Sequence, residues 1–138
     1  MKDLIAKVKE DLSNLLKCEP IEAGSSLLWN IEIPEEQIFC SISVFFDKKN
    51  QDNFTLSVYS TSGIYELHNI QNYTLLPINE IAFWCENNNT YSIMSITENL
   101  KINTLSNVSK YLLDKPIDDL SESELFVNAQ LSMIFEGK

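Results

Sequence analysis

Apolar and polar residues alternate with a period of two through residues 27–70, which is the spacing of strands that have one covered face. The clearest alternating segments are residues 27–33, 38–46 and 54–58, and turn-like linkers rich in Asp, Glu, Asn and Gln separate them. The alternation therefore predicts an antiparallel meander of three strands, followed by a fourth strand or an extension over residues 64–68.

A period close to 3.6 marks the first segment of the chain. Its apolar residues fall within about one third of a helical circumference. They are Leu4, Ile5, Val8, Leu12, Leu15 and Leu16. This pattern predicts an amphipathic helix that ends near Cys18 and lays its apolar stripe on the sheet.

A second helix is predicted near the end of the chain. Ser121 and Glu124 have the spacing of a capping box, and Leu120 and Leu125 have that of a hydrophobic staple. Two apolar sectors follow on the helical wheel: Leu125, Phe126, Ala129 and Met133 form one, and Val127, Leu131, Ile134 and Phe135 form the other. The sheet would cover one sector. A second subunit, a neighbouring helix or a client protein would cover the other, unless the helix is sandwiched in the core.

The segment over residues 72–86 is ambiguous. Ile81, Ala82 and Cys85 suit a helix that Asn79 would cap, whereas residues 81–85 also suit a buried strand; we favour the helix. Residues 91–97 and 100–105 then predict a hairpin, and residues 108–113 either another strand or a short helical turn. The expected fold is α+β, a two-layer α/β sandwich in one domain over residues 1–138: helix, meander, middle helix, hairpin and capped helix.

The charge of the chain limits its partners. The chain contains ten lysines, no arginine and twenty acidic residues, which gives a net charge of −10. Nucleic acid and anionic membranes are disfavoured as partners, because both are bound by clustered positive charge. The charged N-terminus does not resemble a signal peptide, and no apolar stretch is long enough to span a bilayer, so we expect a soluble, cytoplasmic protein.

Residues that could carry catalysis are few. The chain has one histidine, His68, and three cysteines whose spacing fits neither a disulfide framework nor a zinc motif: Cys18, Cys40 and Cys85. We expect these cysteines to be inert thiols, and we expect no metal, no cofactor and no enzymatic activity.

The order of predicted elements and one stretch of sequence resemble a known family. The stretch comprises residues 83–89 and 91–105, then residues 116–120, and it ends in the capping box at Ser121 and Glu124. It resembles the small acidic chaperones of type III secretion and the wider fold family that they share. The resemblance implies a homodimer that keeps a secreted client partly unfolded by covering its apolar segments.

Three functions remain open from the sequence. We favour a non-catalytic acidic module that masks apolar segments of a client protein, with an immunity or antitoxin-like inhibitor of a basic toxin as the alternative and a small enzyme or ligand-binding protein as the second. The residues expected to contact the client are Phe39, Phe45 and Tyr59, aromatics on the polar-facing side of their strands. The residues expected at a homodimer interface are Phe83, Trp84, Phe126 and Met133.

Overall fold

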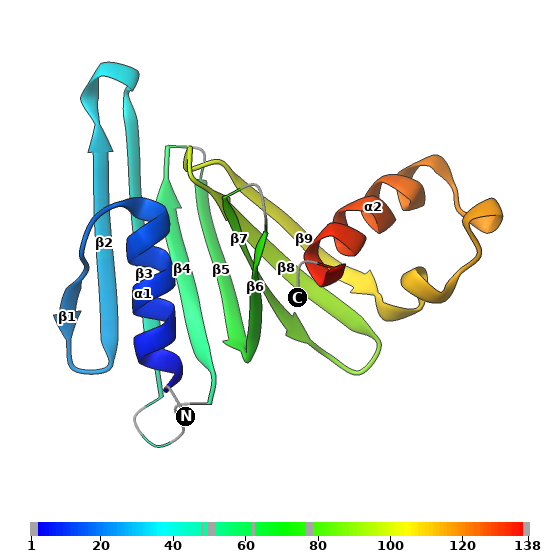
Figure 1. Cartoon of the computed structure of the whole chain (residues 1–138), viewed down its shortest axis with the longest axis horizontal. Coiled ribbons are helices and arrows are strands. Elements are labelled where there is room, and N and C mark those ends of the chain that lie inside the picture. Colours follow the sequence, from blue (N-terminus) through cyan, green and yellow to red (C-terminus); the bar gives the residue numbers. More distant parts are fainter. Residues whose placement is uncertain (1–2, 48, 50–51, 62, 77–78, 137–138) are drawn as a thin grey trace. The chain divides into compact units, whose positions relative to one another are not determined.

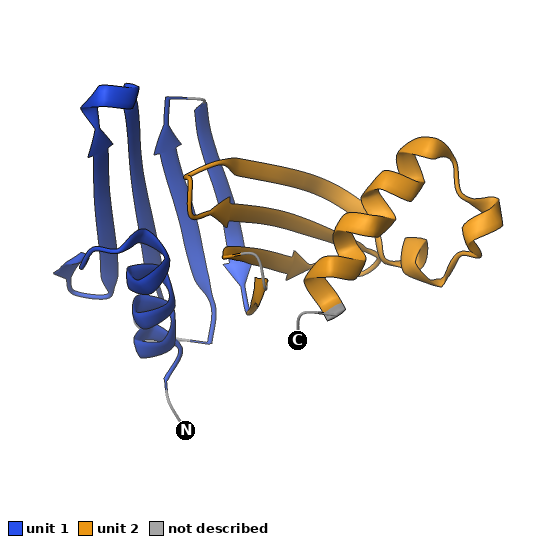
Figure 2. Ribbon diagram, turned by 45° about the horizontal axis from the view of Figure 1, so that its top comes forward, with its two compact units in different colours: residues 1–71 blue, residues 72–138 orange. Residues whose placement is uncertain are grey.

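The computed structural model describes residues 3–47, 49, 52–61, 63–76 and 79–136, with the side chain of the last residue left out. The chain, expected as one domain, divides into two compact units, residues 1–71 and residues 72–138 (Figure 2). Each unit contains one α-helix and one antiparallel sheet (Figure 1). The predicted α+β class is confirmed.

The first unit is a five-stranded meander with a helix on one face. Its sheet has the strand order β1-β2-β3-β4-β5. The elements are α1 (Leu4–Leu16), β1 (Ile21–Ala23), β2 (Ser26–Ile33), β3 (Ile38–Phe46), β4 (Phe54–Ser60) and β5 (Gly63–Ile70), with a 3₁₀ turn, η1 (Pro34–Glu36), between β2 and β3. The predicted three-stranded meander is confirmed as β2, β3 and β4, and the predicted fourth strand over residues 64–68 is confirmed as β5.

The helix α1 follows from its cap and its apolar stripe. The Asp3 carboxylate accepts a hydrogen bond from the Ala6 backbone N–H at 2.8 Å, and Lys17 ends the helix in a left-handed conformation. Val8 and Leu12 are fully buried, and α1 runs along the strands on one face of the sheet (Figure 1). The alternating apolar residues of the strands therefore form the core beneath α1.

The second unit is a four-stranded meander followed by a helix. Its strand order is β6-β7-β8-β9. The elements are β6 (Asn72–Leu76), β7 (Glu80–Glu86), β8 (Thr90–Thr97), β9 (Ile102–Ser109), the 3₁₀ turns η2 (Lys110–Asp114) and η3 (Ile117–Asp119), and α2 (Glu122–Glu136). The predicted hairpin is β8 and β9, and residues 108–113 prove to be both of the alternatives, the end of a strand and a helical turn.

The middle helix predicted over residues 72–86 is wrong, because this segment forms the antiparallel strands β6 and β7. Residues 81–84 are all buried, so both faces of β7 are covered. A strand covered on both faces is apolar throughout, whereas a strand with one exposed face alternates apolar and polar residues. Asn79 adopts a positive φ of 58° in the turn before β7 and so does not cap a helix. Pro77 and Ile78 of the same segment lie outside the described residues.

The capping box of α2 is confirmed by two reciprocal hydrogen bonds. The Glu124 backbone N–H donates to Ser121 Oγ at 3.2 Å, and the Ser121 backbone N–H donates to Glu124 Oε1 at 3.2 Å. Lys115 Nζ also donates to Glu124 Oε2 at 3.2 Å. The backbone hydrogen bond from Ser121, helped by Lys115, holds the pKa of Glu124 below its ordinary value of 4.5. The resulting stabilisation is present above pH 4.5 and is lost as the pH falls through the lowered pKa of the folded state.

We expect Ser121→Ala to lower the free energy of unfolding by about 1 kcal/mol, because the Glu124 backbone N–H loses its acceptor at the N-terminus of α2. Urea denaturation followed by circular dichroism measures this change. Ser106→Ala, at an exposed position of β9, is the matched control and should leave stability unchanged. An equal loss in both variants would show that the cap contributes nothing.

Candidate functional site

The face of the first sheet that points away from α1 carries the three aromatic residues expected to contact a client. We call this surface the open face. Phe39 and Phe45 lie on β3 and Tyr59 lies on β4, each between neighbours in sequence whose side chains point to the α1 side. Their rings are 42%, 49% and 51% exposed. The strand alternation thus places them on one surface, as expected, and leaves about half of each ring in solvent.

Strand register places apolar side chains at both ends of β3 on the open face. Tyr59 stands between Ser41 and Ile64, and Ile64 is also exposed. At the other end, Phe45 stands between Ser26 and Thr55. The row between them is polar on β3 to β5, where it contains Ser43, Ser57 and Glu66, and apolar on β1 and β2, where it contains Leu28 and the exposed Ile21. Along β3 itself, the open face therefore presents apolar anchors separated by serine side chains.

The single histidine lies at the margin of the open face. His68 Nε2 is 3.3 Å from Glu66 Oε2, and His68 Nδ1 is 3.4 Å from Thr55 Oγ1. Cys40 pairs with Ile31 and Ser60 and points to the opposite, buried side of the sheet. Burial raises the pKa of the Cys40 thiol to about 11, so that it stays protonated at neutral pH. His68 and Cys40 are therefore not arranged as a catalytic dyad.

The second unit confirms that α2 has two apolar sectors. Leu131 and Ile134 are buried against the sheet, whereas Leu125, Phe126 and Met133 are exposed. Phe126 is the most exposed of these three, at 64%. We call this second sector, which also contains Ala129, the outer sector of α2. It leaves an apolar strip of the helix uncovered by its own chain.

Phe83 and Trp84, the other two residues expected at a homodimer interface, are not on the surface. Phe83 is fully buried, with its ring 5.2 Å from that of Tyr73. Trp84 is 1% exposed and meets Phe135 of α2 edge-to-face at 5.3 Å. Expecting them at the surface was wrong, because it rested on a helix whose outer side would have carried them, whereas they lie on the two covered faces of β7.

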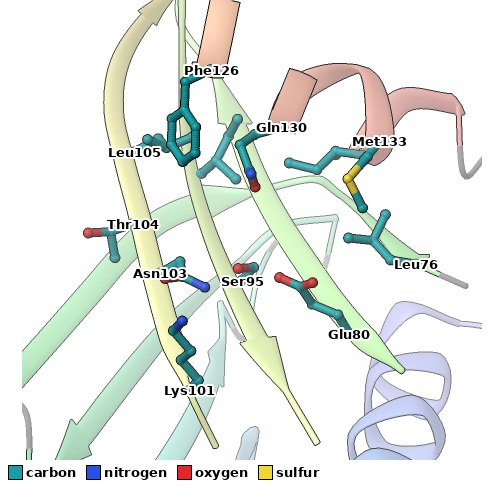
Figure 3. A pocket seen from close by; sticks show the side chains of 12 residues that line it. Leu76, Glu80, Ser95, Lys101, Asn103, Thr104, Leu105, Phe126, Gln130 and Met133 are labelled. Atoms are coloured by element: carbon teal, nitrogen blue, oxygen red, sulfur yellow. The ribbon is translucent and has the colours of Figure 1, made fainter. Parts of the chain in front are cut away.

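A cavity of about 360 Å³ lies beside the outer sector, within the second unit (Figure 3). Its walls come from all four strands and from α2. Its lining residues are Leu76, Glu80, Ile93, Ser95, Lys101, Asn103, Thr104, Leu105, Phe126, Gln130, Met133 and Ile134. Phe126 and Met133 of the expected dimer interface therefore border a hollow rather than a flat surface.

The cavity follows from side-chain size in successive rows across the sheet. On the α2 side, strand register aligns the large residues Trp84, Ile93 and Leu105 in one row. The next row contains the smaller side chains of Thr74, Ala82, Ser95 and Asn103. Side chains of this second row cannot fill the space that one helix leaves uncovered.

Sequence reasoning did not identify this cavity. Its smaller residues stand in four different strands, so no single stretch of sequence contains them, and the available signal was the polar Ser95 within the apolar run of β8. Because residues 72–86 were predicted to be a helix, the pairing of Ala82 in β7 with Ser95 in β8 could not be anticipated.

Within the described part of the chain, no three His, Cys, Asp or Glu residues gather closely enough to hold a metal ion. Neither α1 nor α2, nor any other described helix, has the length and apolarity needed to cross a membrane. Comparisons with protein-family models, with curated proteins and with solved structures gave no match.

Proposed function

We propose that the chain is a cytoplasmic, non-catalytic protein-binding module that masks an apolar segment of a client protein on its open face. The observation that carries the proposal is the half-exposed trio Phe39, Phe45 and Tyr59 on one face of the first sheet. Large aromatic side chains that stay half exposed on one face of a sheet are typical of protein interaction surfaces.

The spacing of the anchors defines the segment that would fit. Phe39 and Phe45 are six residues apart on β3, roughly 20 Å at the rise of a strand. An extended client segment would therefore need apolar side chains about six residues apart, with small or polar residues over the serine centre.

Charge defines the flanks of that segment. The strand positions on the open face include Glu32, beside Phe39, and Glu66, beside Ser57, and none of them is a lysine. A client with lysine or arginine around its apolar anchors would complement this field, and the net charge of −10 would speed the encounter.

Dimerisation through the outer sector of α2 belongs to the same proposal. Leu125, Phe126 and Met133 offer an apolar strip that a second copy would cover. The resemblance to secretion chaperones supports this arrangement, although β6 and β7 stand where that resemblance has a helix. An immunity-type inhibitor of a basic toxin is the second candidate, favoured by the same excess of acidic residues.

Synthetic peptides test the proposal directly. We expect a peptide with two apolar anchors six residues apart and lysine flanks to bind, and its glutamate-flanked counterpart to bind at least about tenfold more weakly. The triple variant Phe39→Ser, Phe45→Ser, Tyr59→Ser should weaken binding by roughly a hundredfold, because buried aromatic anchors dominate interface energies. Fluorescence anisotropy measures the affinities.

Two controls separate the surfaces and the candidates. The double variant Phe126→Ser, Met133→Ser should bind the peptide normally but run as a monomer in size exclusion with light scattering, where the wild type runs as a dimer. An unchanged peptide affinity in the triple variant would rule out the open face. Binding that depends on the lysines alone, is lost in moderate salt and ignores the apolar anchors would favour the inhibitor, because screening weakens exposed charge pairs far more than apolar contacts.

A further inference from the structure

Ser95 contributes a hydroxyl group to the wall of the cavity beside α2. Ser95 is 7% exposed, lies in the middle of the sheet and lines the cavity (Figure 3). A hydroxyl that lines an open cavity is available to hydrogen-bond with a molecule bound there.

Two opposite charges line the same cavity without meeting. The β7 residue Glu80 pairs with Thr97 of β8. On the other side, the Thr97 backbone N–H donates to the Lys101 carbonyl oxygen at 3.1 Å, and the Lys101 backbone N–H donates to Thr97 Oγ1 at 3.0 Å. The backbones of Glu80 and Lys101 are thus about two strand spacings apart, roughly 10 Å. Neither side chain forms an ion pair with the other or with any other described residue. Glu80 and Lys101 therefore leave a gap that a molecule with both charges could bridge.

The remaining lining residues are mostly apolar, and Asn103, Thr104 and Gln130 are the polar exceptions. Phe126 lies near Leu105 at one end of the cavity, and Met133 lies near Leu76 at the other, while Glu80, Ser95 and Asn103 line its floor (Figure 3). The volume of about 360 Å³ lies at the lower end of the range of small-molecule sites. The site thus combines a polar floor that carries both signs of charge with apolar side chains from α2 and the outer strands.

We infer that this cavity binds a small zwitterion with an apolar side chain, of the class of the large apolar α-amino acids. Its ammonium group would contact Glu80, its carboxylate would contact Lys101, and Ser95 would hydrogen-bond to one of these groups. Its side chain would contact Phe126 and Met133. This site is separate from the open face and does not depend on client binding there.

Three probes of nearly equal size test the assignment. Isothermal titration calorimetry should detect L-phenylalanine binding with a dissociation constant that is roughly submillimolar, as expected for a ligand of about a dozen heavy atoms. The analogue 3-phenylpropanoate lacks the amine and 2-phenylethylamine lacks the carboxylate. Each should bind about tenfold more weakly, since each leaves one charged side chain of the cavity without its partner.

Variants assign each charge to its residue. Glu80→Gln should weaken phenylalanine and phenylethylamine but leave phenylpropanoate unchanged, and Lys101→Met should show the opposite selectivity. Glu98→Gln and Lys49→Met, which change the same charges outside the cavity, are the matched controls. Ser95→Leu should fill the cavity and abolish binding, and Ser95→Ala, which removes only the hydroxyl, should bind more weakly while keeping the melting temperature of the wild type.

Several outcomes would overturn the inference. Absence of both heat and amide chemical-shift changes at about 10 mM phenylalanine would do so, as would binding that survives Ser95→Leu. Equal affinity for the three probes would contradict the zwitterion. A wild-type dimer that Ser95→Leu converts to a monomer would assign the cavity to a second copy of the chain. None of these results alters peptide binding at the open face, so the two proposals fail independently.

Discussion

Replacing Trp84 with alanine is expected to lower the free energy of unfolding by about 3–5 kcal/mol. The indole is 1% exposed on the α2 side of β7, where it meets the ring of Phe135, and Phe135 in turn lies 5.2 Å from the ring of Tyr91. Removing it leaves a void between the sheet and α2 that the neighbouring rings cannot refill. This aromatic cluster joins α2 to β7 and β8.

Phe126→Ala is the matched control for this prediction. It also removes a large aromatic side chain near α2, but the Phe126 ring is 64% exposed, so the loss should be less than about 1 kcal/mol. Chemical denaturation followed by circular dichroism measures both variants. Similar losses would show that the outer sector is as well packed as the covered one, which would remove the reason for proposing a partner there.

Aspartate at two successive positions of β3 is expected to have opposite consequences. Val44→Asp should abolish cooperative folding of the first unit or cost at least about 4 kcal/mol, because Val44 is fully buried beneath α1 and no described lysine lies beside it in the sheet. Phe45→Asp should cost about 1 kcal/mol or less, because Phe45 points to the open face and is 49% exposed.

The two variants distinguish burial from side-chain size, because Phe45→Asp removes the larger side chain and is still expected to cost less stability than Val44→Asp. Thermal unfolding and amide exchange of the β2–β4 ladder measure it. Tolerance of aspartate at Val44 together with loss of folding at Phe45 would mean that β3 is shifted by one residue, since such a shift moves every side chain to the other face. The aromatic residues of the open face would then be core residues.

Much of the fold was predictable because it depends on local periodicity. The alternation along β2 to β4 sets which side chains are buried whatever the strand order, so the positions of Phe39, Phe45 and Tyr59 on the exposed side followed from the sequence. The capping box at Ser121 and Glu124 is contained within four residues, and its hydrogen bonds are those expected. The two sectors of α2 also follow from helical geometry, and the structure shows which one is covered.

The segment around β7 was not predictable in the same way. A run such as residues 81–85 is apolar whether it is a buried helix or a central strand, and only pairing with β6 and β8 distinguishes the two. The same pairing buries Phe83 and Trp84, which the sequence had suggested for a surface.

The sequence alone was enough to predict the hydrophobic periods, the capped helix, the acidic charge and the aromatic rings on one side of the first sheet, because each depends on neighbours within about one turn or one strand. The division into two units and the cavity shared by Glu80, Ser95 and Lys101 became visible only in the folded chain. Both features depend on strands that are distant in sequence and pair in the fold. The sequence of one strand does not show whether its small side chains will stand beside other small side chains on the neighbouring strands and so leave a cavity.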